Sequence, residues 1–237
     1  MSGHPFFLVF SCSVYLLPLS SGLAFKSQLD QVVLLYPGQV RSEGDLDTCK
    51  NGGICSIVHD TFWIPPRAER LCRCPGGEEC PYTLAKPHDN RTLFLNNRAQ
   101  MKTCNRTDEM PVCKSEQTAL IIEETQTEAF KERKVLATAF CTCENPKYWT
   151  LQKHFLEKHP NGTTHMTSHY HCTNLGKCKV DEHCANVRLD YYSTYQHCLC
   201  PKGQQCLANK SMVTNVTELL FSGPAYRAYC SPFPSTE

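Results

Sequence analysis

Cysteine is the residue type in this sequence whose number and spacing indicate most clearly which chemistry its side chains could carry out. The 237 residues include 17 cysteines, and two sets of six follow one order, C-x5-C and then C-x-C-x5-C-x23-C. The sets are Cys49, Cys55, Cys72, Cys74, Cys80, Cys104 and Cys178, Cys184, Cys198, Cys200, Cys206, Cys230. Thiols can bind metals, act as nucleophiles or form disulfides. No C-x-x-C pair occurs, as a redox motif or zinc ribbon would require, so the repeated spacing favours disulfides.

The start of the chain indicates the compartment. An apolar run over residues 6–19 is followed by Gly22 and Ala24, which predicts a signal peptide over residues 1–24 and a mature protein that begins at Phe25. The run is too short to cross a bilayer, and no other apolar stretch reaches that length, so we expect a secreted protein without a membrane span. Cleavage removes Cys12, and sixteen cysteines, an even number, predict eight disulfides and no free thiol.

N-glycosylation sequons support the same route. Five asparagines have Ser or Thr two positions later with no Pro between: Asn90, Asn105, Asn161, Asn209 and Asn215. The formal net charge is only +1, which gives no electrostatic reason to expect nucleic acid or an anionic membrane as partner. The sequence therefore favours a secreted, extracellular glycoprotein.

A third, degenerate copy of the cysteine pattern lies between the two full ones. Its members are Cys113, Cys141, Cys143 and Cys172, which match the second, third, fourth and sixth cysteines of the pattern. The first and fifth are missing together. Losing one partner of a disulfide would leave a reactive thiol, so joint absence suggests that the first and fifth cysteines are bonded to each other. This argument predicts the disulfides Cys49–Cys80 and Cys178–Cys206.

The elements that carry these cysteines are predicted to be small. In both full copies a C-x-C pair on a strand precedes a Pro and Gly turn, and the fifth cysteine lies on the returning strand, which is typical of a hairpin. Residues 115–139 are rich in Glu, Gln, Ala, Lys and Leu, and they and residues 149–158 predict helices. We therefore expect a small disulfide-rich fold of short β-hairpins and loops, with one or two helices in the middle.

The pattern divides the chain into segments. We expect a signal peptide (1–24), an N-terminal arm (25–48), a first cysteine module (49–104), a degenerate middle module with a helical insert (105–172), a second full module, here called the last module (173–230), and a tail (231–237). Residues 32–36 of the arm are apolar. They form either a strand that docks on the first module or part of a flexible arm, which the mature protein retains.

Metal and cofactor sites are not predicted. Five of the ten histidines fall close together, His154, His159, His165, His169 and His171, and imidazole is a common metal ligand. Their spacing fits no zinc pattern, so we interpret them as exposed loop histidines. The acidic residues Asp45 and Asp47 could offer oxygen ligands to calcium, but a solvated acidic linker is the favoured interpretation.

Catalytic motifs are also missing from the sequence: there is no G-x-S-x-G, no phosphate-binding glycine loop and no free thiolate. We expect no enzymatic activity and no cofactor. Trp63 and the tyrosines Tyr191, Tyr192 and Tyr195 could bind a partner, although in small modules such aromatics more often form the core. Residues 62–70, with Arg67 and Arg70, are the one candidate for the exposed loop of a protease inhibitor.

Two resemblances add to this interpretation. The stretch Cys49-Lys-Asn-Gly-Gly-Ile-Cys55 resembles part of an epidermal-growth-factor module, and that resemblance implies the disulfides Cys49–Cys72 and Cys74–Cys80. The last module lacks the Asn-Gly-Gly sequence, so we favour the pairing from the internal repeat. A growth-factor-like corner would suit an extracellular signalling or structural protein.

The second resemblance covers residues 49–230. The cysteine order, with Cys74-Pro75-Gly76-Gly77 and Cys200-Pro201-Lys202-Gly203, resembles the eleventh scoloptoxin family of centipede venoms. This resemblance implies a secreted venom protein of similar size and cysteine number, with no assigned catalytic residues. The expected function is a non-enzymatic toxin that binds an extracellular target such as an ion channel or receptor; a secreted protease inhibitor is the alternative, with a protease as partner.

Overall fold

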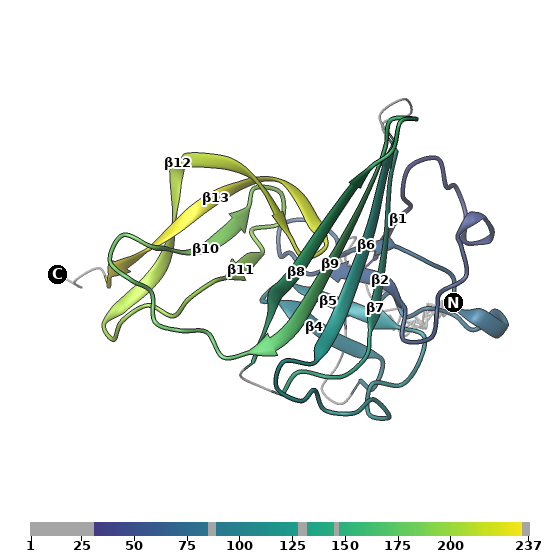
Figure 1. The fold of residues 1–237 in the computed structure, drawn as a ribbon, viewed down its shortest axis with the longest axis horizontal. Helices are drawn as coiled ribbons and strands as arrows, with labels where there is room; N and C mark the ends of the chain where they lie inside the picture. Colours follow the sequence, from purple (N-terminus) through teal and green to yellow (C-terminus); the bar gives the residue numbers. More distant parts are fainter. Residues whose placement is uncertain (1–30, 85–88, 128–131, 145–146, 234–237) are drawn as a thin grey trace, which may run out of the picture.

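The computed structural model describes residues 31–84, 89–127, 132–144 and 147–233. The predicted signal peptide and Cys12 lie outside these residues. The strands form three sheets, which follow one another along the chain (Figure 1). The middle sheet stands upright in this view, with the last sheet, in yellow-green, on its left.

The first sheet has five strands in the order β1-β3-β2-β5-β4. Their bounds are β1 (Val33–Leu35), β2 (Ile54–His59), β3 (Arg67–Arg70), β4 (Thr92–Asn96) and β5 (Ala99–Thr103). β1 belongs to the N-terminal arm and pairs in parallel with β3, from Val33 opposite Arg67 to Leu35 opposite Glu69. Of the two interpretations of the arm, docking on the first module is therefore the one that the structure shows.

The middle sheet has four long antiparallel strands in the order β7-β6-β9-β8. Their bounds are β6 (Thr118–Thr127), β7 (Glu132–Ala139), β8 (Tyr148–Lys158) and β9 (Thr163–Thr173). The predicted helices over 115–139 and 149–158 are therefore wrong: the first region is the hairpin β6–β7 and the second is β8. The described residues contain two short 3-10 turns, Glu43–Asp45 and Pro75–Gly77, and no α-helix.

The alternation of buried and exposed side chains explains why this module forms strands and not helices. In β6 the residues Leu120, Ile122 and Glu124 are buried, and the residues between them are more exposed, as the period of two in a strand requires. Several positions are β-branched, which favours a pleated surface. Glu, Gln and Lys raise helix propensity, but the packing of one face against the core overrides that weak preference.

The last sheet has the order β11-β10-β13-β12. Its strands are β10 (His183–Arg188), β11 (Thr194–Gln196), β12 (Gln204–Glu218) and β13 (Phe221–Pro232). β12 and β13 form a hairpin with 15 and 12 residues per strand, which is much longer than the short hairpins that the sequence suggests. Antiparallel pairing over this length lets a small module hold its shape with few buried side chains.

Eight disulfides join the sixteen cysteines of the described residues. The full modules share one pairing order, first with third, second with fifth and fourth with sixth: Cys49–Cys72, Cys55–Cys80, Cys74–Cys104 and Cys178–Cys198, Cys184–Cys206, Cys200–Cys230. The middle module has Cys113–Cys141 and Cys143–Cys172. The predicted pairs Cys49–Cys80 and Cys178–Cys206 are therefore wrong.

The prediction failed because Cys113 was aligned with the second cysteine of the pattern. The argument that two cysteines lost together are disulfide partners holds. Cys113 bonds Cys141, so it takes the role of the first cysteine of the pattern and not of the second. The middle module has therefore lost the second and fifth cysteines, which are partners in both full modules. The growth-factor resemblance implies Cys49–Cys72 correctly, but its other pair, Cys74–Cys80, is also wrong.

One hydrophobic cluster connects all three sheets. It includes Ile57 and Met101 of the first sheet, Leu120 of the middle sheet, and Leu220 and Phe221 of the last hairpin. The first module and the middle sheet also meet at Gly52, whose carbonyl accepts a hydrogen bond from the amide of Ala139 at 2.9 Å. A Cβ at Gly52 would lie 2.4 Å from the Ala139 carbonyl oxygen, so this contact requires glycine.

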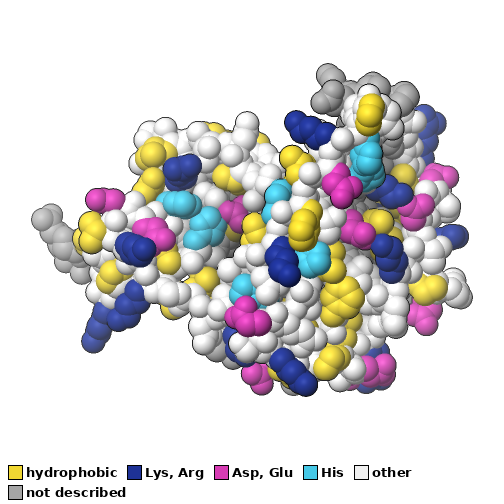
Figure 2. All heavy atoms as spheres, viewed as in Figure 1, with side chains coloured by type: hydrophobic (Ala, Val, Ile, Leu, Met, Phe, Trp, Pro, Cys, Tyr) yellow, Lys and Arg dark blue, Asp and Glu magenta, His cyan; other side chains and the backbone are white. Residues whose placement is uncertain are grey.

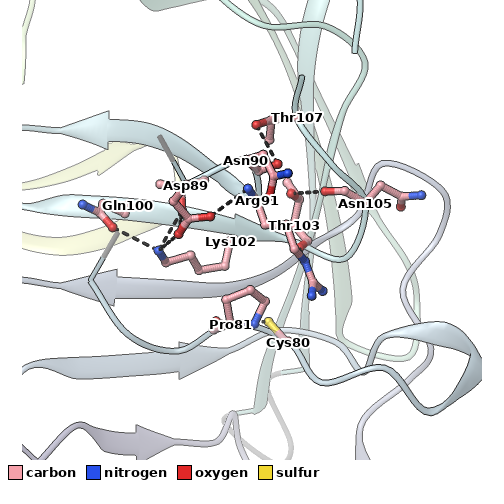
Figure 3. A network of polar contacts seen from close by, with 11 residues as sticks. Cys80, Pro81, Asp89, Asn90, Arg91, Gln100, Lys102, Thr103, Asn105 and Thr107 are labelled. Carbon is pink, nitrogen blue, oxygen red and sulfur yellow. Dashed lines mark hydrogen bonds and ion pairs between the residues drawn. The ribbon is translucent and has the colours of Figure 1, made fainter. Parts of the chain in front are cut away.

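A buried lysine holds the far edge of the first sheet (Figure 3). The Lys102 side chain is fully buried, and its Nζ donates to Thr92 Oγ1 at 2.7 Å, Gln100 Oε1 at 3.1 Å and Asp89 Oδ2 at 3.4 Å. Burial lowers the pKa of Lys102, although Asp89 counteracts this effect. The charge is thus paired as buried charges require.

Replacing Lys102 by methionine should therefore destabilise the protein. The change keeps the approximate size of the side chain but removes the charged donor to Thr92 Oγ1 and the cation paired with Asp89, which keeps only its hydrogen bonds from the Arg91 amide and Thr92 Oγ1. We therefore expect a loss of about 2–3 kcal/mol in the free energy of unfolding. Urea denaturation measures this loss. Lys153→Met on the exposed strand β8 is the control and should change stability by less than about 0.5 kcal/mol. Wild-type stability of Lys102→Met would show that the network contributes nothing.

Candidate functional site: an exposed aromatic patch

An exposed group of aromatic side chains lies where the first and last modules meet. Phe62 and Trp63 contact each other edge to face with ring centroids 4.7 Å apart, and Trp63 contacts Tyr192 in the same way at 5.4 Å. The guanidinium of Arg98 lies 5.7 Å from the Phe62 ring centroid and 5.5 Å from that of Trp63. We call these four residues the aromatic patch. Phe62, Trp63 and Tyr192 are 79%, 37% and 42% exposed.

Local backbone contacts fix the part of the patch that comes from the first module. Phe62 and Trp63 lie in the loop between β2 and β3, where Thr61 Oγ1 donates to the carbonyl of Ile64 at 3.1 Å. Arg98 lies in the turn between β4 and β5, and its carbonyl accepts a hydrogen bond from the amide of Asp60 at 2.8 Å. The two loops are therefore tied together, and they hold the aromatic rings beside the guanidinium.

The last module supplies Tyr192 from the turn between β10 and β11. Tyr192 has a φ of 52°, and its amide donates to the carbonyl of Arg188 at 3.1 Å. This left-handed backbone conformation is uncommon for a residue with a large side chain. It directs the ring of Tyr192 to the surface, while the ring of its neighbour Tyr191 is buried.

Two neighbouring tyrosines of the last module are buried. Tyr191 stacks on His59 of the first module with ring centroids 4.4 Å apart, and Tyr195 stacks on Phe221 at 6.2 Å. Burial raises the pKa of Tyr195 to about 12. The expectation that the tyrosines form core is therefore correct for Tyr191 and Tyr195 and wrong for Tyr192, which is exposed and contacts Trp63.

Charged and polar side chains surround these buried rings. His59 Nε2 lies 3.1 Å from Glu69 Oε1, and Arg188 makes two hydrogen bonds to Asp190 at 2.8 and 2.6 Å. Burial alone would raise the pKa of Glu69 and of Asp190. The hydrogen bond and charge of His59 outweigh burial at Glu69, and those of Arg188 outweigh it at Asp190, so both pKa values fall below their usual range.

Acid should therefore loosen this junction. Because both carboxyl pKa values are lowered by folding, their contribution to stability is complete above the ordinary values of 3.8 for Asp190 and 4.5 for Glu69, and it is lost as the pH falls through the lower folded-state values. In a Trp149→Phe background, Trp63 fluorescence should stay constant from pH 7 to 5 and change below about pH 4. Asp190→Asn should make this change shallower. Constant fluorescence down to pH 2 would contradict the proposed role of the carboxylates.

The side chain of one asparagine, Asn97, also joins the first and last modules beside the patch through two hydrogen bonds. The side chain of Asn97 accepts from the Thr194 amide at 2.9 Å and donates to Thr194 Oγ1 at 3.5 Å. The junction between the first and last modules, across which Trp63 contacts Tyr192, therefore contains hydrogen bonds, apolar contacts and charged side chains. Trp, Tyr and Arg are the residues most enriched at the centres of protein interfaces, because they combine large apolar area with a polar group. The patch has the composition of a protein-binding surface.

The loop considered for protease inhibition has a different structure from the one expected. Arg67 and Arg70 lie on β3, a strand between β1 and β2, and not on a loop. Arg70 is buried and makes two hydrogen bonds of 2.6 Å to Glu43. The Arg67 guanidinium lies 5.9 Å from the Tyr191 ring centroid. These arginines hold the arm and the module junction in place.

The predicted loop histidines lie mainly on strands. His154 is on β8, and His165, His169 and His171 are on β9; His159 follows β8 in the turn between them. His154 Nδ1 contacts Ser168 Oγ and His165 Nδ1 contacts Thr125 Oγ1, each at 3.0 Å. In the part of the chain that the structure describes, the ligand atoms of three or more His, Cys, Asp or Glu residues converge only among the disulfide cysteines.

The acidic residues Asp45 and Asp47 both contact other residues of the protein. Asp45 Oδ2 accepts hydrogen bonds from the amide and hydroxyl of Ser42 at 3.1 and 2.9 Å, which caps a 3-10 turn. Asp47 pairs with Lys134 of the middle sheet. Both carboxylates thus have protein partners and contribute to local structure.

The predicted glycosylation sites differ in exposure. Asn105, Asn161, Asn209 and Asn215 are exposed, and Asn90 is partly buried. In Figure 3, Thr107, which belongs to the sequon of Asn105, hydrogen-bonds the Asn90 carbonyl through its amide and hydroxyl. Glycosylation at the five sites stays a prediction.

The visible surface carries mixed charge. Figure 2 shows basic and acidic side chains interspersed over the middle and last sheets, with hydrophobic side chains between them. In the described ranges, no helix is long and apolar enough to cross a membrane.

The curated proteins that the chain resembles are scoloptoxin(11) proteins of centipedes. No protein-family model matches the chain. U-scoloptoxin(11)-Ssd2a of Scolopendra dehaani is 26% identical over 179 residues, which cover 68% of this chain and 72% of that protein. U-scoloptoxin(11)-Sa3a of Scolopendra alternans is 27% identical over 178 residues, with the same coverage. Kappa-scoloptoxin(11)-Ss1a of Scolopendra dehaani is 35% identical over 79 residues, which cover 31% of this chain and 33% of that protein.

One solved structure has a similar fold. The crystal structure of unliganded Argos matches with a TM-score of 0.53 and 24% sequence identity, and the match covers 86% of this chain and 99% of that one. At this identity the likeness concerns the fold.

Proposed function

From the relationship of this chain to the scoloptoxin(11) proteins, we propose that it is a secreted, non-enzymatic venom-type protein that binds an extracellular protein target. The target class is an ion channel or receptor, and the aromatic patch is the binding surface. The eight disulfides suit an oxidising extracellular compartment.

One observation carries this assignment: Phe62, Trp63 and Tyr192 are exposed although they are held in a fixed arrangement. Exposed aromatics of this size normally gain free energy by burial, at about 25 cal/mol per Å². A folded protein that keeps three of them together at its surface, next to Arg98, has the features of an interface centre.

The framework around the patch favours tight binding. Cys49–Cys72 and Cys55–Cys80 tie together the segments that flank the Phe62 loop, and Cys184–Cys206 fixes the strand β10 that leads to Tyr192. A surface that is rigid before binding loses little conformational entropy in the complex. Binding should therefore depend on intact disulfides and on no reactive group.

The alternatives receive less support. A protease inhibitor would need Arg67 or Arg70 on an exposed loop, and both lie on β3. For a signalling or structural role, the similarity to the structure of unliganded Argos at 24% identity shows a shared fold and no shared role.

The test applies fluorescently labelled protein to cultured arthropod neurons. Native protein should bind saturably, compete with unlabelled protein and alter membrane currents. Treatment with a chelator should leave binding intact, whereas reduction and alkylation should abolish it, because the patch then loses its support. A panel of serine proteases is tested in parallel.

Three outcomes would contradict the proposal. Turnover of a substrate would make the protein an enzyme. Tight protease inhibition would favour the inhibitor function. Equal cell binding before and after reduction would show that the folded surface is not what the target recognises.

A further inference from the structure

Two histidines and a glutamate of the last module contact one another, away from the segment that the sequence suggested for metals. His183 is the first residue of β10, His197 follows β11, and Glu218 is the last residue of β12. The three side chains are partly exposed. Figure 2 shows histidine side chains, in cyan, on the surface of the lobe that this sheet forms.

The two imidazoles face each other through nitrogen atoms. His183 Nε2 lies 3.1 Å from His197 Nδ1, and the ring planes are inclined by 76°. Two imidazole nitrogens at neighbouring corners of a tetrahedral zinc site are about 3.3 Å apart, because zinc–nitrogen bonds are about 2.0–2.1 Å long. The spacing of these nitrogens is thus close to that of a metal-bound pair, and a rotation of each ring by roughly 35° would direct both lone pairs at one ion.

Glu218 gives His197 the orientation that a metal ligand needs. Glu218 Oε1 lies 2.6 Å from His197 Nε2 and accepts a second hydrogen bond of 2.6 Å from Asn186 Nδ2. A proton on His197 Nε2 leaves the Nδ1 lone pair free on the side of His183. Metal-binding histidines typically donate their other N–H to a carboxylate in this way, and the carboxylate makes the ligand more basic.

Charges and competing ligands around the pair also permit a cation. Glu218 and Glu182 act on His183 with negative charge, against the positive charge of Arg227. The cysteines of the described residues are all in disulfides, so thiolates, which bind Cu²⁺ and Zn²⁺ strongly, do not compete.

We infer that His183 Nε2 and His197 Nδ1 form a binding site for a divalent transition-metal ion, Cu²⁺ or Zn²⁺, with Glu218 orienting His197 and water completing the coordination. Imidazole favours these ions, and Cu²⁺ is the stronger binder of the two in the usual order of affinities. The ion would link β10 to the segment after β11. This site is independent of the aromatic patch, so its loss should leave target binding unchanged.

The experiment titrates the purified, oxidised protein with CuCl₂ and follows the electron paramagnetic resonance spectrum, with equilibrium dialysis for stoichiometry. We expect one site with nitrogen ligands and a melting temperature that rises with bound metal. At the copper concentration that half-saturates the wild type, His183→Ala and His197→Ala should show no occupancy of this site. Glu218→Gln should weaken binding by about 10- to 100-fold, because it removes the orienting carboxylate.

The matched control is the double variant His159→Ala/His165→Ala. These two rings are also in contact, at 4.9 Å between centroids, but His165 Nδ1 contacts a threonine hydroxyl. The control variant should bind copper as the wild type does. Glu218→Gln changes the side chain least and keeps the test valid if the alanine variants fold poorly. Copper binding that persists at full affinity in Glu218→Gln, or that disappears in the control, would overturn the assignment.

Discussion

Trp63→Ala should weaken binding of the protein to arthropod neurons by at least about thirtyfold, since loss of an aromatic residue at the centre of an interface costs about 2 kcal/mol or more. Trp63 contacts both Phe62 and Tyr192, so its removal also separates the two modules' contributions to the patch. The measurement is competition of each unlabelled variant against labelled wild-type protein. Tyr192→Ala should have an effect of similar size, because the patch needs both modules.

Phe155→Ala is the matched control for this prediction. Phe155 is an aromatic residue on β8 that is 51% exposed, and it lies outside the patch. Its removal should change binding by less than about twofold, and near-ultraviolet circular dichroism should show that all three variants are folded. Full binding by Trp63→Ala would contradict the aromatic patch as the interface. A large loss of binding in Phe155→Ala would place the interface on the middle sheet.

Removal of the disulfide Cys74–Cys104 by double alanine substitution should cost about 2–5 kcal/mol of stability. Removal of Cys55–Cys80 in the same way should cost at least about 1 kcal/mol less, although the loops closed are similar, 30 and 25 residues, and chain entropy predicts nearly equal effects. The reason is that the middle module keeps its sheet without the second of these bonds and retains the first as Cys143–Cys172.

Urea denaturation of the two double variants tests this difference. Single substitutions at Cys55 or Cys80 should be worse than the double change, because they leave an unpaired thiol in the oxidised protein. Equal destabilisation by both double variants would show that the cysteine pairs missing from the middle module are not the dispensable ones.

The cysteine spacing made the threefold modular pattern predictable, but it could not assign partners. The spacing of Cys72, Cys74, Cys80 and Cys104 in the first module recurs unchanged in the last module. This repeat predicted two related folds, and the structure shows the same pairing order in both. The hairpin β6–β7 lengthens the gap between Cys113 and Cys141 to 28 residues, against 23 and 20 in the full modules. This insertion hid the equivalence of Cys113 to the first cysteine.

The helix prediction failed where local composition and tertiary packing disagree. Glu123 and Lys134 favour helix by propensity, although both lie next to buried residues, Ile122 and Val135. The apolar residues 119–122 are consecutive in the sequence, so the alternation is visible only in the burial pattern of the folded strand.

The aromatic patch could be predicted only in part. Trp63 and the three tyrosines were recognised as candidates, but nothing in the sequence shows that Tyr192 faces solvent while Tyr191 is buried. That difference depends on the positive φ of Tyr192 in its turn and on the contact between two modules that are more than a hundred residues apart. Arg98 and Phe62 carried no signal that distinguishes them from other surface residues.

Hydroxyl-radical footprinting of the protein bound to its neuronal target tests the central claim most directly, because it reports which side chains become covered. We expect strong protection of Phe62, Trp63 and Tyr192 in the complex, and unchanged oxidation of Phe155 and Leu156 on β8. Protection of the β8 residues with Trp63 still fully reactive would contradict the assignment of the aromatic patch as the binding surface.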